Sequence, residues 1–183
     1  MPDAVGVESA GFPCRFRIVS RGWFREGWDI KDGNGELVGG FDRRSKGWVT
    51  TVEWIEISGL QGVPPIEIRP SPEPTFSLMI CDPKIFKVFV GGQEIGRVMI
   101  GEMSTSFTAG SALRSCHAVR VAGMARPVIE IRDDSGRTFG QFVGMNLFHM
   151  RFEIRLAEPE MLPEAVVLCA ASYLGNRTSC SAV

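Results

Sequence analysis

The sequence predicts a mainly β protein, a closed antiparallel barrel of about twelve strands around a buried C-terminal helix. Three observations support this: short apolar segments alternate with turns along most of the chain, a hairpin pattern is repeated, and one wholly apolar segment lies near the C-terminus. The chain has 183 residues with 21 glycines, and no long regular repeat explains so much glycine. Many tight turns therefore connect many short strands.

The first hairpin pattern, Trp28 to Phe41, recurs from Ile129 to Phe142. Each copy alternates apolar residues, places Asp and Gly at the turn, and ends with an apolar residue followed by glycine. A third, tighter copy follows the segment from Phe86 to Val90. Asp with Gly supplies the positive-φ turn of a hairpin. The glycine after the second apolar segment, at Gly39, Gly96 and Gly140, predicts a bulge or a close backbone approach.

Further strands are expected at 14–19, 48–57, 75–80, 116–121 and 149–156. The prolines between Pro64 and Pro74 predict a connecting loop or edge, since proline cannot donate a backbone hydrogen bond. We expect residues 1–13 to be a flexible N-terminal segment, 14–176 a single barrel domain and 177–183 a flexible tail.

The last element is a helix that is apolar around its whole circumference, beginning near Pro163 and capped by Gly175. Its apolar part, 165–174, spans about 15 Å at ~1.5 Å per residue, which is half of a bilayer core. Such a helix has to be buried on all sides, and a closed barrel provides that environment. The predicted core residues of this helix are Ala165, Val166, Val167, Leu168, Ala170, Ala171 and Leu174.

These hairpins and the ending from Phe152 to the terminal helix resemble the tubby C-terminal-like superfamily, in particular its phospholipid scramblase and LURP-one-related branch. The resemblance covers about Phe16 to Leu174. It implies a twelve-stranded barrel around a helix and a non-enzymatic role at membrane phospholipid, through phosphoinositide binding or phospholipid scrambling. The family's acidic segment is reduced here to Glu158, Glu160 and Glu164, so we expect no calcium dependence. No cofactor or metal is expected.

The densest basic cluster is Arg43, Arg44 and Lys46, beside Trp48 and between two expected strands. A basic loop next to an aromatic residue could bind anionic lipid headgroups, or it could be a solvated hairpin tip. The second basic group is Arg15, Arg17, Arg21 and Arg25. Because Arg15 and Arg17 alternate with Phe16 and Ile18, this group is interpreted as the polar face of a strand.

The net charge and the positions of cysteine and histidine argue against nucleic-acid binding and nucleophilic catalysis. Lys and Arg number 20 against 21 Asp and Glu, a net charge of -1, so no nucleic-acid partner is expected. Cys116 and His117 are neighbours on one strand and would point to opposite faces. A nucleophilic pair of Cys116 or Cys14 with His149 has no local support in the sequence.

The sequence shows no signal peptide, and the expected location is the cytoplasm, with peripheral attachment to membranes. An alternative function is a protein-interaction scaffold that contacts a protein partner through loops such as 59–74. A third is an enzyme or carrier with a ligand inside the barrel, which would need a large apolar cavity in place of the helix.

Overall fold

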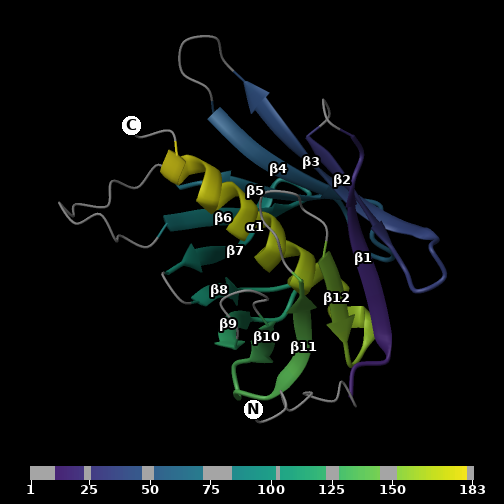
Figure 1. The fold of residues 1–183 in the computed structure, drawn as a ribbon. Helices are drawn as coiled ribbons and strands as arrows, with labels where there is room; N and C mark the ends of the chain where they lie inside the picture. Colours follow the sequence, from purple (N-terminus) through teal and green to yellow (C-terminus); the bar gives the residue numbers. More distant parts are fainter. Residues whose placement is uncertain are drawn as a thin grey trace.

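A single closed antiparallel barrel surrounds one helix (Figure 1). The computed structural model describes residues 11–22, 26–46, 52–71, 84–101, 104–122, 128–144 and 152–180. Within this part of the chain, each of twelve strands pairs with the next one along the sequence, and β1 (Cys14–Ser20) pairs with β12 (Phe152–Leu156) to close the ring. The predicted fold class is confirmed.

The ten strands between these two follow the order of the sequence. They are β2 (Gly27–Lys31), β3 (Leu37–Lys46), β4 (Val52–Ser58), β5 (Ile66–Pro70), β6 (Lys84–Val90), β7 (Gln93–Ile100), β8 (Ser104–Ala109), β9 (Cys116–Ala122), β10 (Val128–Asp133) and β11 (Thr138–Val143). A short 3-10 helix, η1 (Pro159–Met161), then leads into α1 (Leu162–Cys180).

Helix α1 forms the centre of the core. Every residue from Ala165 to Ala171 and also Leu174 has 0% exposure, so all seven predicted core residues of the helix are confirmed. Around the helix, aromatic rings from the strands complete the packing: the centroid of Tyr173 lies 4.6 Å from that of Trp28, which stacks on Phe41.

The helix does not end where the sequence suggested. Gly175 is not its C-terminal cap, because α1 continues to Cys180 and includes 177–180, which we expected to be a flexible tail. Gly175 serves close packing instead: a Cβ there would lie 2.4 Å from Cδ1 of Ile100 in β7. The ammonium group of Lys84 donates a hydrogen bond to the carbonyl oxygen of Gly175 at 2.5 Å. The other expected flexible segment, 1–13, lies mostly outside the described residues.

The three repeated glycines confirm both parts of their prediction. In each hairpin the strand register shifts at the residue before the glycine, which leaves Val38, Ile95 and Phe139 as the extra residues of β-bulges. The neighbouring strands also pass close by. A Cβ would meet the carbonyl oxygen of Thr108 at 2.4 Å from Gly96 and that of Arg155 at 2.8 Å from Gly140.

The two long hairpins share the same turn chemistry. Asp32 Oδ1 accepts backbone hydrogen bonds from Asn34 at 2.9 Å and Glu36 at 2.8 Å. Asp133 Oδ1 accepts the equivalent bonds from Ser135 and Arg137, both at 3.0 Å. The turns also require a positive φ, which Gly35 and Gly136 supply at 86° and 83°.

Two strands were missed. Residues 66–70 form β5 and are not part of a connecting loop, because Ile66 and Ile68 are both fully buried on the inner face. Pro64 and Pro65 precede this strand, and Pro70 is its last residue. Strand β8 has only Thr105 and Phe107 on its buried face, and its serines and threonines gave too weak an apolar pattern to detect. The strand expected at 75–80 lies outside the described residues, as do 48–51 and 149–151.

Truncation of the helix core should be costly. We expect Leu168→Ala to lower the free energy of unfolding by about 2–5 kcal/mol, since a fully buried side chain would leave a cavity. Met99→Ala is the control, because Met99 is 47% exposed on β7 and should change stability by about 0.5 kcal/mol or less. Urea unfolding measures both. Equal effects would contradict the buried position of the helix.

Gly96 should not accept a methyl group. We expect Gly96→Ala to destabilise the fold by about 1–3 kcal/mol, because the added Cβ would press on the backbone of β8. At Gly101 the nearest atom to an added Cβ is the carbonyl oxygen of Ser104 at 3.5 Å, an ordinary contact. Gly101→Ala should therefore be nearly neutral in the same unfolding measurement, and a comparable loss at both positions would refute the close approach at Gly96.

The turn at Asp133 makes a pH-dependent contribution. The Ser135 hydroxyl donates to Asp133 Oδ1 at 2.5 Å, and this bond is the main reason that the pKa of Asp133 lies below its usual value. A carboxyl whose pKa is lower in the folded state than in the unfolded state stabilises the fold at pH values above its unfolded pKa. That stabilisation is lost as the pH falls through the pKa of the folded state. We expect Ser135→Ala to raise the pKa of Asp133 in an NMR titration. Ser20→Ala, whose hydroxyl contacts Gly22, should leave it unchanged.

Candidate functional site

The barrel lumen is filled by protein. The residues of α1 that lie inside are fully buried, and they occupy the space in which a ligand would lie if the barrel were a carrier. A ligand or partner of this domain would therefore have to bind at the outer face of the sheet or at the ends of the barrel.

Two buried cysteines, the candidate nucleophile Cys116 and also Cys169, are poorly placed for nucleophilic chemistry. Burial raises the pKa of the Cys169 thiol, and burial together with the charge of Glu164 raises that of Cys116, so both thiols stay protonated. Cys116 is buried and His117 is only half-buried on the opposite face of β9, as the alternation predicts. His149, the other proposed partner, lies outside the described residues.

Among the described residues, no group of three or more His, Cys, Asp or Glu side chains is arranged to hold a metal ion. In the same residues, no helix combines the length and apolar character needed to cross a bilayer.

The structure places Arg43, Arg44 and Lys46 in strand β3, so the prediction that they form a loop between strands is wrong. Strand β3 extends to Lys46 because it pairs with β4 along its whole length. Successive residues of a strand face opposite sides. Arg43 lies opposite the fully buried Ile55 and faces the inner side, whereas Arg44 and Lys46 face outward.

Carboxylates already neutralise two of these three cations. The Arg43 guanidinium contacts Glu26 and Glu53, and its side chain is only 15% exposed. Arg44 Nε lies 3.0 Å from Glu56 Oε2. The binding of lipid by Arg43, Arg44 and Lys46 stays a prediction, but the three do not form one surface patch.

The interpretation of the second basic group as the polar face of a strand is confirmed for Arg15 and Arg17, and the structure places Lys31 opposite Arg17. Arg15 and Arg17 are exposed on the outer face of β1, and Lys31 of β2 lies directly opposite Arg17. Arg21 forms ion pairs with two carboxylates: its Nε lies 2.5 Å from Asp29 Oδ1 and its Nη1 lies 2.8 Å from Asp42 Oδ1. The hydrogen bond to Asp29 raises the pKa of Arg21. Arg25 lies outside the described residues.

We define the β1–β2 cation cluster as Arg15, Arg17 and Lys31. Most arginines of the barrel are paired with a carboxylate, and this cluster is not. None of the three contacts a carboxylate among the described residues. Arg114 and Arg120 also lack such a partner there, but they stand singly. The arginines that are paired with carboxylates are Arg21, Arg43, Arg44, Arg69, Arg97, Arg132, Arg137 and Arg155.

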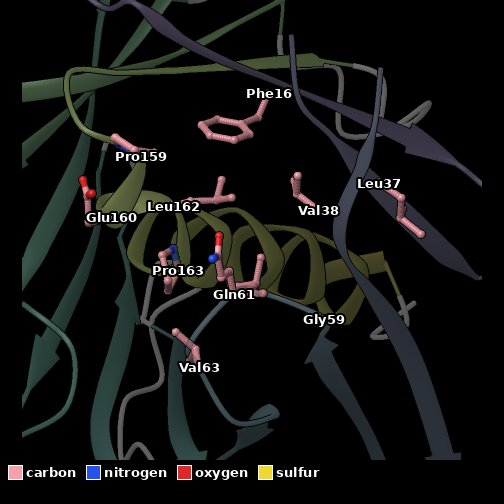
Figure 2. Close-up of a pocket in the computed structure, with 11 residues that line it drawn as sticks. Phe16, Leu37, Val38, Gly59, Gln61, Val63, Pro159, Glu160, Leu162 and Pro163 are labelled. Carbon is pink, nitrogen blue, oxygen red and sulfur yellow. The ribbon is translucent and has the colours of Figure 1, made fainter. Parts of the chain in front are cut away.

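An apolar groove of about 580 Å³ opens at the end of the barrel where α1 begins (Figure 2). It lies between β1, the start of β3, the loop after β4 and the η1–α1 junction. Its lining residues are Phe16, Leu37, Val38, Gly59, Leu60, Gln61, Val63, Pro159, Glu160, Leu162 and Pro163. No pattern in the sequence predicts this groove, because four distant segments contribute to it.

The groove and the β1–β2 cation cluster adjoin one another. Leu37 lines the groove and lies directly opposite Lys31, which in turn lies opposite Arg17. Directly opposite residues have Cβ atoms about 5 Å apart, so the cations begin at the lip of the groove. We take this end of the barrel as the candidate site. No protein-family model, curated protein or solved structure matches the chain.

Proposed function

We propose that this chain is a non-enzymatic barrel protein that associates with anionic phospholipid at a membrane surface, through the β1–β2 cation cluster. The observation that carries the proposal is the lack of carboxylate partners for Arg15, Arg17 and Lys31 among the described residues. A basic residue near an anionic membrane contributes about 1 kcal/mol of binding free energy. Three such residues on one rigid face are enough for reversible attachment.

The arrangement of these cations favours an anionic ligand. Arg17 lies directly opposite Lys31, and Arg15 lies directly opposite Arg155 of β12. Like charges in opposite positions of a sheet repel each other, and a bound anion would relieve that repulsion. The nearest acidic neighbour on β12, Glu153, lies opposite Arg17, but its carboxylate is 2.6 Å from Arg155 Nε.

An exposed apolar side chain next to the cations favours a lipid surface over a dissolved anion. Leu37 is 64% exposed, the highest value among the large hydrophobic residues that the structure describes as exposed. It lies opposite Lys31 and can enter the boundary between headgroups and acyl chains while the cations contact phosphates. The resemblance to the scramblase and LURP-one-related branch also supports a phospholipid ligand, with a phosphoinositide or a role in scrambling as the finer alternatives.

Vesicle co-sedimentation tests the proposal. We expect the protein to bind vesicles that contain phosphatidylserine or a phosphoinositide and not to bind vesicles of pure phosphatidylcholine. Binding should weaken as the salt concentration rises. Replacing Arg15, Arg17 and Lys31 together by Gln should weaken binding on the order of 100-fold, since three contributions of ~1 kcal/mol are removed. Equal binding to neutral and anionic vesicles would refute the proposal and favour a protein-interaction scaffold.

Two further variants make the comparison specific. The control replaces Arg69, Arg97 and Arg132 by Gln, which removes the same charge from arginines paired with carboxylates elsewhere on the outer face. We expect it to bind nearly as well as the parent chain. A second variant, Arg44→Gln with Lys46→Gln, tests the other end of β3. Loss of binding in this variant alone would move the site to that end and contradict the β1–β2 assignment.

A further inference from the structure

We propose that the apolar groove at the start of α1 binds the hydrocarbon chain of a single-chain anionic amphiphile, with the anionic head held at Lys31 and Arg17. The head-group contacts rest on the proposed phospholipid function, and the groove adds a site for one acyl chain. The protein would then recognise the tail of a lipid as well as its charge.

The size and lining of the groove fit a hydrocarbon chain. Its volume of about 580 Å³ lies within the roughly 300–1,000 Å³ of small-molecule sites. Apolar surface comes from all four segments that line the groove, through Phe16, Val38, Leu60, Val63 and Leu162. Figure 2 shows Phe16, Val38, Val63 and Leu162 around a shared open space at the barrel end.

Charge sets the orientation of the ligand. Glu160 is the only charged residue of the lining, and it lies on the opposite side of the groove from Leu37 (Figure 2). An anionic head is repelled from Glu160 and attracted to Lys31, which is adjacent to Leu37. The chain of the amphiphile therefore enters past Leu37 and extends toward Leu162 and Pro163.

Titration calorimetry with dodecyl phosphate, below its micelle concentration, tests this site. We expect saturable binding of one molecule per chain, with a negative heat-capacity change from burial of apolar surface. Octyl phosphate, which lacks four methylene groups, should bind roughly 100-fold more weakly, and inorganic phosphate should not bind detectably. Binding of all three with similar affinity would show a plain phosphate site and overturn the groove assignment.

Filling the groove should abolish this binding. We expect Val63→Phe to weaken dodecyl phosphate at least tenfold, whereas Val119→Phe, on the outer face of β9, should have no effect. Lys31→Gln is a surface change that does not depend on core packing. It should weaken dodecyl phosphate and leave decanol binding unchanged. Unaltered dodecyl phosphate affinity in both Val63→Phe and Lys31→Gln would overturn the proposal.

The outcomes separate this inference from the proposed function. If anionic vesicles bind through Arg15, Arg17 and Lys31 but dodecyl phosphate does not bind, the groove assignment fails and the membrane function stands. If dodecyl phosphate binds and Val63→Phe removes it, yet vesicles of any charge are ignored, the groove assignment stands and the membrane function fails.

Discussion

The burial of a helix that is apolar on every side is the constraint on which the rest of this structure depends. A helix satisfies its own backbone hydrogen bonds, but an apolar circumference must be covered all the way round. A closed sheet does this and removes its own exposed edges at the same time. Ser172 and Thr105 are hydrogen-bonded at this interface: the Ser172 hydroxyl donates to the Leu168 carbonyl oxygen at 2.8 Å and lies 3.1 Å from the Thr105 hydroxyl. Oε2 of the buried Glu164 has no hydrogen-bond partner among the described residues.

Filling the lumen also determines where function can reside. Inside the lumen, the fully buried residues of α1, from Ala165 to Ala171 and also Leu174, occupy the space that a second molecule would need. Glu164 connects the start of the helix to the loop between β8 and β9, since its Oε1 accepts a hydrogen bond from the backbone N–H of Arg114 at 2.9 Å. Recognition is thereby confined to the outer face and to the ends, where η1 and the loop after β4 leave the apolar groove open.

The sequence predicted the helix and the repeated hairpins because their signals are local. Glycine is needed at Gly96 and Gly140 by a neighbouring backbone, and it recurs at the same place in each hairpin. Strand β8 was not predicted because most of its residues are polar and its buried face is short, so it lacks an alternating apolar pattern. The groove could not be predicted at all, since its lining comes from segments that only closure of the barrel brings together.

Strand alternation also explains why a dense run of basic residues is a poor guide to a binding surface. Arg43 and Arg44 are adjacent in sequence, yet they point to opposite sides of β3 and each meets a carboxylate. From Leu37 to Lys46, β3 extends about 30 Å at ~3.3 Å per residue, so Lys31 and Lys46 cannot contact one headgroup. A cationic site on a barrel is instead assembled across strands, as Arg17 and Lys31 are, and only the strand register reveals it.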